Sequence, residues 1–137
     1  MDVLSNSTPT ARKSHICMFC GGIIAKGKKY RRQVNIIDGE IGVFKCHEEC
    51  QDLAHRLDMY DDCDPDYGLT DEMFCIEIDN YIDAIHYDME TEELETEWHN
   101  LTRCQQVLKI LEELKSEENE NNNDKALGGL VKPIITI

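Results

Sequence analysis

Hydrophobic and polar positions in the first half of the chain predict a β-hairpin followed by a helix. Two segments containing β-branched residues, Tyr30–Ile37 and Glu40–Lys45, are expected to form strands. Asp38-Gly39 separates them and is a strong hairpin signal, because glycine tolerates a positive φ. Apolar residues recur at helical spacing directly after the second strand. A helix is therefore expected over residues 47–60, with its apolar side against the hairpin.

Apolar spacing in the second half of the chain predicts two more helices. Thr70 is expected to cap a helix that runs to about Tyr87. Its apolar stripe consists of Phe74, Ile78, Tyr81, Ile82 and Ile85. Thr91 is expected to cap a longer helix that runs to about Lys115. The apolar stripe of this helix consists of Leu94, Trp98, Leu101, Cys104, Val107, Leu108, Leu111 and Leu114. The stripe predicts packing on the preceding helix or, alternatively, self-association through residues 94–114.

The remaining segments lack such periodicity. Residues 1–14 are rich in Ser, Thr and Asn and predict a flexible N-terminus. Ser116–Asp124 is a Glu/Asn run and predicts a linker. The segment 126–137 is apolar. It is expected to dock on its own domain, to add as an extended segment to a partner, or to be disordered.

Length and cysteine content restrict the class of protein. A chain of 137 residues corresponds to one domain, or to one domain with a tail. No apolar run approaches the length of a membrane span, and residues 1–14 have no apolar core typical of a signal peptide. Seven cysteines without a secretion signal favour a reducing cytoplasm, where thiols are free or bind metal.

Charge divides the chain into two unequal parts. Residues 1–57 carry nine Lys/Arg and six Asp/Glu, a net charge of +3. Residues 58–137 carry five Lys/Arg and twenty-two Asp/Glu, a net charge of −17. The acidic part repels the phosphates of nucleic acids and membranes, and it favours a protein partner with a basic surface.

Two ligand pairs at the ends of the predicted hairpin indicate a zinc site. Cys17 and Cys20 bracket two residues before the hairpin, and His47 and Cys50 have the same spacing after it. A turn that holds two thiolates and the first turn of a helix together supply four tetrahedral ligands. Cys46 is the alternative to His47, because its spacing of four residues from Cys50 also fits one helix face.

These residues also carry a resemblance to a known family. The resemblance rests on Cys17-x-x-Cys20-Gly21, Lys26-Gly27, Tyr30, Asp38-Gly39 and His47-x-x-Cys50. Together they resemble a treble-clef, LIM-like zinc module. More narrowly, they are similar to the small zinc-finger proteins of bacteriophages and prophages, most of which are uncharacterised. The resemblance covers about residues 15–60 and implies a structural zinc. It also implies a cytoplasmic protein, in the bacterial host if the protein is phage-encoded, and it implies no activity.

The sequence as a whole predicts an α+β protein that is not an enzyme. A treble-clef module over residues 15–60 is expected to precede an acidic helical hairpin over 61–116, with the linker and apolar segment over 117–137. No phosphate-binding loop, nucleophile elbow or metalloprotease helix is present. The expected function is a phage-type interaction module that binds or inhibits a host protein through its acidic helices.

The alternative function is nucleic-acid binding through a basic segment of the hairpin. That segment contains Lys26, Lys28, Lys29, Tyr30, Arg31 and Arg32. Its cations are suited to phosphates, and its tyrosine is suited to stacking on a base.

Overall fold

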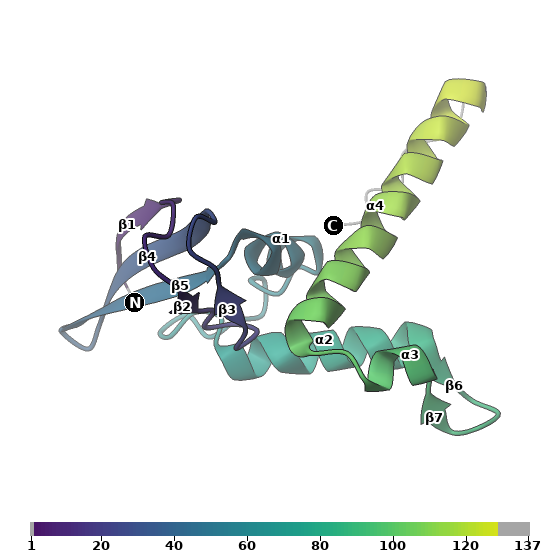
Figure 1. Ribbon diagram of the computed structural model, residues 1–137, viewed down its shortest axis with the longest axis horizontal. Coiled ribbons are helices and arrows are strands. Elements are labelled where there is room, and N and C mark those ends of the chain that lie inside the picture. Colours follow the sequence, from purple (N-terminus) through teal and green to yellow (C-terminus); the bar gives the residue numbers. More distant parts are fainter. Residues whose placement is uncertain (1, 129–137) are drawn as a thin grey trace.

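The structure is a computed structural model that describes residues 2–128, without the side chains of residues 93, 94, 96, 99 and 120–128 (Figure 1). It has the α+β class that the sequence predicts. The strands are β1 (Asp2–Ser7), β2 (His15–Ile16), β3 (Ile23–Ile24), β4 (Tyr30–Ile37), β5 (Glu40–His47), β6 (Tyr87–Asp88) and β7 (Glu93–Leu94). The helices are α1 (Glu48–Arg56), α2 (Asp71–His86), α3 (Thr96–His99) and α4 (Arg103–Gly128). Residues 129–137, most of the apolar C-terminal segment, lie outside the described part of the chain.

The hairpin of β4 and β5 confirms the prediction from sequence. The two strands pair antiparallel from Tyr30 opposite His47 to Ile37 opposite Glu40. Asp38 and Gly39 both have positive φ values, 52° and 81°, as a two-residue turn between right-twisted strands requires. β5 extends beyond the predicted Lys45 to His47, so the strand leads directly into α1.

The prediction of a flexible N-terminus is wrong for residues 2–7. These residues form β1, which pairs antiparallel with β4 and makes a three-stranded sheet in the order β1-β4-β5. All six residues are exposed, so the strand has no apolar pattern to reveal it. Backbone pairing holds it, together with side-chain hydrogen bonds such as that from the Arg31 guanidinium to the Asn6 side-chain oxygen.

α1 is shorter than the helix predicted over 47–60. It begins after His47 and ends at Arg56. Asp58 then adopts the left-handed conformation with φ 53°, which a continuing helix does not allow. The prediction for α2 is confirmed, because the Thr70 hydroxyl accepts a hydrogen bond from the Met73 N–H (3.3 Å) at its N-terminus.

The prediction of a continuous helix from Thr91 to about Lys115 is wrong. Residues 87–94 form a short hairpin of β6 and β7, and α3 and α4 follow as separate helices. The Asp88 carboxylate accepts hydrogen bonds from the N–H groups of Glu90 (2.8 Å) and Thr91 (3.4 Å). Asp88 therefore makes a turn where Thr91 was expected to begin a helix, and Glu92 with φ 56° completes it.

The N-terminus of α4 carries a reciprocal cap that the sequence interpretation missed. The Thr102 hydroxyl accepts from the Gln105 N–H (3.2 Å), and the Gln105 side chain accepts from the Thr102 N–H (2.9 Å). α4 continues to Gly128, so the linker predicted over Ser116–Asp124 is also wrong. Glutamate is a strong helix former, and the ion pair between Arg56 and Glu118 ties this part of α4 to α1.

Thr102→Ala is expected to lower the free energy of unfolding by about 1 kcal/mol, because it leaves an N–H at the helix terminus without its acceptor. Thr91→Ala is the matched control, since Thr91 is exposed and begins no helix. The control is expected to change the free energy by less than about 0.5 kcal/mol. Urea denaturation of both variants measures the difference, and equal effects would contradict the assignment of the cap.

One hydrophobic core joins the hairpin region to the helices. The cluster contains residues from the N-terminal half, such as Phe19 and Leu53, and residues from the helices, such as Phe74 and Trp98. α4 packs against α1 and α2 and buries Val107, Ile110, Leu111 and Leu114. Two residues of the predicted stripes, Ile85 (52% exposed) and Leu108 (45%), point outward. Within residues 2–128, no helix combines the length and the apolar character of a membrane span.

Candidate metal centre

Four residues from two separate segments meet where the hairpin joins α1. Cys17 and Cys20 lie in a tight turn between β2 and β3. His47 is the last residue of β5 and the N-cap of α1, and Cys50 lies in the first turn of that helix. Each residue offers one ligand atom, and all four atoms lie within 4.8 Å of one another. The structure thus brings together the four residues that the sequence selects.

The spacing of the ligand atoms fits a tetrahedral metal ion. Cys17 Sγ lies 3.8 Å from Cys50 Sγ, and His47 Nδ1 lies 3.3 Å from Cys20 Sγ and 3.8 Å from Cys50 Sγ. A tetrahedron with metal–sulfur bonds of about 2.3 Å has sulfur–sulfur edges of about 3.8 Å. The cluster therefore has the size required to hold a metal ion at its centre.

Backbone groups orient the ligands from outside the cluster. The N–H groups of Cys20 (3.5 Å) and His47 (3.4 Å) donate to Cys17 Sγ, and the N–H of Gly22 donates to Cys20 Sγ (3.4 Å). His47 Nε2 lies 2.9 Å from the Ile23 carbonyl oxygen, which can only accept, so Nε2 carries the proton. This hydrogen bond directs Nδ1 toward the sulfurs, in the manner of a histidine ligand fixed by its second nitrogen.

Protons and a metal ion compete for the same lone pairs in the cluster. Hydrogen bonds from Cys20 and then from Cys50 hold the pKa of Cys17 below its ordinary value. Interaction with Cys17 and then with Cys20 raises the pKa of His47 to about 11. Hydrogen bonding to Cys17 and Cys20, together with burial, raises the pKa of Cys50. A metal ion that binds all four groups must displace these protons, so acid opposes metal binding.

Cys46 lies outside the ligand cluster. It is buried in β5 at 2% exposure, and burial raises the pKa of its thiol to about 12. The four ligand atoms that lie within 4.8 Å of one another belong to Cys17, Cys20, His47 and Cys50, and the Cys46 thiol is not among them.

Sequence reasoning missed the close packing of α4 on the turn between β2 and β3. We call this turn, which holds Cys17 and Cys20, the ligand turn. A Cβ added at Gly22 would lie 3.3 Å from the Cβ of Cys104 and 3.4 Å from Cys20 Sγ. Glycine at this position therefore allows α4 to approach the ligand turn closely. The spacing of Cys104 from the other cysteines gives no sign of this contact, because it arises from the way the helices pack.

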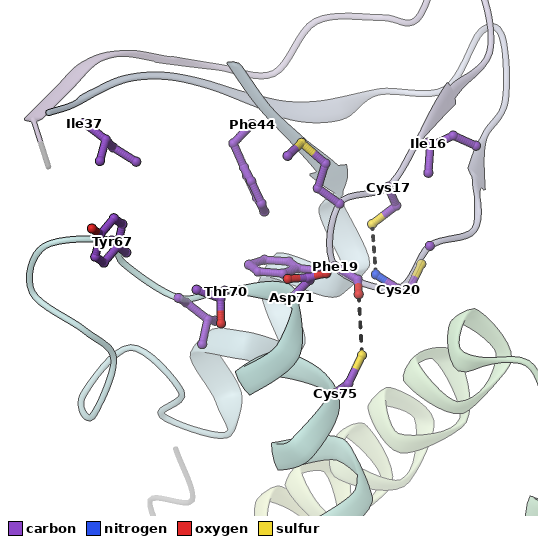
Figure 2. Close-up of a pocket in the computed structure, with 13 residues that line it drawn as sticks. Ile16, Cys17, Phe19, Cys20, Ile37, Phe44, Tyr67, Thr70, Asp71 and Cys75 are labelled. Carbon is purple, nitrogen blue, oxygen red and sulfur yellow. Dashed lines mark hydrogen bonds between the residues drawn. The ribbon is translucent and has the colours of Figure 1, made fainter. Parts of the chain in front are cut away.

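An open hollow of about 690 Å³ lies beside the ligand turn, between the hairpin and α2 (Figure 2). The Phe19 ring, from between the two cysteines of the turn, stacks on Phe74 with centroids 4.5 Å apart. It also meets Phe44 edge-on at 4.8 Å. Figure 2 shows the Cys75 thiol beneath the same turn, donating to the Phe19 carbonyl oxygen (3.8 Å). α2 thus supports the ligand turn through the contacts of Phe74 and Cys75 with Phe19.

The structure places the residues of the predicted basic segment in different environments. Lys26, Lys28 and Lys29 are exposed. Tyr30 is buried at 6% exposure, so its ring is not free to stack on a base. The Arg31 guanidinium bonds to the side chains of Thr8 and Asn6, and Arg32 lies on the opposite face of β4 from Arg31.

A second group of possible ligands, His86, Glu95 and Glu97, lies near the C-terminus of α2. His86 contacts carboxylates of Glu95 (3.3 Å) and Glu113 (2.8 Å). Glu97 forms an ion pair with Lys109 (2.9 Å), whose ammonium also lies over the Trp98 ring. We assign these contacts to packing between α2, β7, α3 and α4, because each carboxylate already has a cationic or imidazole partner.

Comparisons with known proteins assign no family and no function to this site. No protein-family model, no curated protein and no solved structure matches the chain.

Proposed function

We propose that residues 15–60 form a treble-clef zinc module in which Zn²⁺ has a structural role. Its support is the cluster of three thiolates and one imidazole, spaced for a tetrahedral ion. Thiolate and imidazole ligands in this geometry favour zinc over hard cations such as Mg²⁺ or Ca²⁺. The ligands come from a turn, a strand end and a helix start, and a metal ion would fasten these three elements together.

The proposed zinc site does not support catalysis. Four protein ligands fill a tetrahedral coordination sphere and leave no position for an activated water or a substrate. We therefore propose a non-enzymatic protein. In it, the zinc module of residues 15–60, called the head below, supports a binding surface on the helices.

The surface that best fits a partner is an acidic groove between α2 and α4. This hollow of about 440 Å³ is lined by Tyr81, Ile85, Lys109, Glu112, Glu113, Ser116 and Glu117. Glu112 and Glu117 are exposed and have no ion pair in the described part of the chain. Ile85 and Tyr81 offer apolar surface beside these carboxylates. A lysine or arginine of a partner can lay its aliphatic stem on the apolar residues and its cation among the carboxylates.

The main support for the proposed function is the net negative charge of the second half of the chain. Residues 58–137 hold a net charge of −17, far more than a small domain needs for solubility. We propose a phage-type factor that binds or inhibits a host protein by presenting this surface to a basic patch. Self-association through residues 94–114 has less support, because the apolar side of α4 is buried within the chain.

The proposal is tested by affinity capture from a nuclease-treated bacterial lysate with matched charge variants. Glu112→Lys/Glu117→Lys is expected to lose a specific protein partner that wild type retains at low salt. Asp61→Lys/Asp62→Lys is the control, because it makes the same charge change at exposed residues of the loop before α2. The control is expected to retain the partner. Equal loss in both variants, or a partner that is captured only when the nuclease treatment is omitted, would contradict the proposed function.

A further inference from the structure

A second charged surface lies on the hairpin, and its charge is opposite to that of the helices. Arg32 on β4 pairs directly with Lys45 on β5, so both side chains stand on one face of the sheet. Directly opposed side chains have Cβ atoms about 4.5–5.5 Å apart, where like charges destabilise the pair. Neither cation forms an ion pair within the described residues.

Two more cations approach this face from the segment that follows β1. A hollow of about 560 Å³ is lined by Pro9, Thr10, Arg12, Lys13, His15, Tyr30 and Arg32. Lys45 reaches its edge, with Nζ 3.4 Å from His15 Nδ1. No carboxylate is among the residues that line the hollow. Among the residues that the structure describes, these four cations thus have no counter-charge, in a chain that carries twice as many acidic as basic residues.

The backbone that presents these cations is fixed. The Ala11 N–H donates to the Lys28 carbonyl (2.8 Å), the Gly27 N–H donates to the Ala11 carbonyl (2.8 Å), and the Tyr30 N–H donates to the Pro9 carbonyl (3.1 Å). Ala11 is buried at 3% exposure, which anchors the residue directly before Arg12. Such positioning reduces the conformational entropy that the surface would lose when it binds an anion.

We propose that Arg12, Lys13, Arg32 and Lys45 form a binding site for phosphate groups, either of a nucleic-acid backbone or of a free oligophosphate. Arginine forks and lysine ammonium groups both bind phosphate oxygens through charge-assisted hydrogen bonds. The bound anion would relieve the repulsion between Arg32 and Lys45. Recognition would rest on charge without base stacking, because the Tyr30 ring is buried. This site is independent of the acidic groove and shares no residue with it.

The test titrates the full-length protein, in a buffer without phosphate, with inorganic tripolyphosphate by calorimetry. In parallel, a fluorescent oligodeoxythymidylate of about twelve nucleotides is titrated by anisotropy at about 50 and 200 mM salt. Arg32→Gln/Lys45→Gln is expected to weaken binding of the preferred probe about tenfold. Lys26→Gln/Lys28→Gln removes the same charge from exposed residues outside the hollow and is expected to change binding less than about twofold.

Thermal unfolding gives a second readout that does not depend on the binding signal. Tripolyphosphate is expected to raise the midpoint of wild type but not that of Arg32→Gln/Lys45→Gln. Tighter binding of the oligonucleotide with a steep salt dependence would identify a backbone phosphate site, and preference for tripolyphosphate would identify a small-molecule site. The proposal would be overturned by equal weakening in the two variants or by the absence of binding of either probe. Full displacement of the bound probe by polyglutamate would also overturn it.

Discussion

Cys17→Ser is expected to abolish metal binding and to unfold the N-terminal head, and Cys50→Ser is expected to do the same. Both residues are about 1% exposed, and their sulfurs lie 3.8 Å apart at the centre of the ligand cluster. Structural zinc contributes about 10–16 kcal/mol in small zinc-finger peptides, whereas a whole domain is stable by only about 5–15 kcal/mol. Losing a ligand therefore removes a contribution as large as the total stability.

The measurement is metal content after purification, together with circular dichroism of the same samples. Cys46→Ser is the matched control, because Cys46 is as deeply buried as Cys17 and receives the same change of atom. The control is expected to retain one metal ion per chain, with a modest loss of stability from the buried hydroxyl. If Cys17→Ser retained its metal and its fold, the ligand assignment would be wrong. If Cys46→Ser lost the metal, Cys46 would replace His47 in the site.

Phe74→Ala is expected to lower the free energy of unfolding by about 3–5 kcal/mol and the midpoint by about 10–17 °C. Phe74 is fully buried and stacks on Phe19, which lies between two proposed metal ligands. The lost ring leaves a cavity at the place where α2 supports the ligand turn. We expect the head and the helices to unfold together, since one hydrophobic cluster includes both.

Three signals test this coupling in one thermal experiment. Circular dichroism follows the helices, the fluorescence of Trp98 follows the packing of α3 and α4, and a chromogenic chelator follows release of the metal. The three transitions are expected to coincide in wild type and to move together in Phe74→Ala. Met73→Ala, at an adjacent and 39% exposed position, is the control with a small expected effect. Metal release that stays unchanged while the helices melt early would show two independent units.

The sequence predicts those parts of the fold that depend on local chemistry. Asp38-Gly39 specifies its turn because the backbone needs positive φ at both positions. Thr70 specifies the start of α2 because its hydroxyl satisfies a free N–H. The four ligands are recognised because a tetrahedral zinc site requires thiolates and imidazoles at short, regular spacings.

The remaining features depend on partners that are distant in sequence. β1 consists of exposed residues, and its pairing with β4 leaves no trace in its own apolar pattern. Thr91 has the residue type and neighbours of a helix cap, but the Asp88 carboxylate uses the local N–H groups for a turn. In the cation cluster, the register of the sheet sets Arg32 opposite Lys45, and backbone hydrogen bonds between residues 9–11 and 27–30 bring Arg12 and Lys13 to them.

Zinc K-edge X-ray absorption on the protein purified without added metal tests the proposed ligand set. We expect one zinc per chain, with three sulfur ligands at about 2.3 Å and one nitrogen at about 2.0 Å. That first shell would correspond to Cys17, Cys20, His47 and Cys50. A first shell of four sulfur atoms would mean that another cysteine binds the metal in place of His47. A first shell of oxygen atoms, or a folded protein without metal, would contradict the structural zinc site.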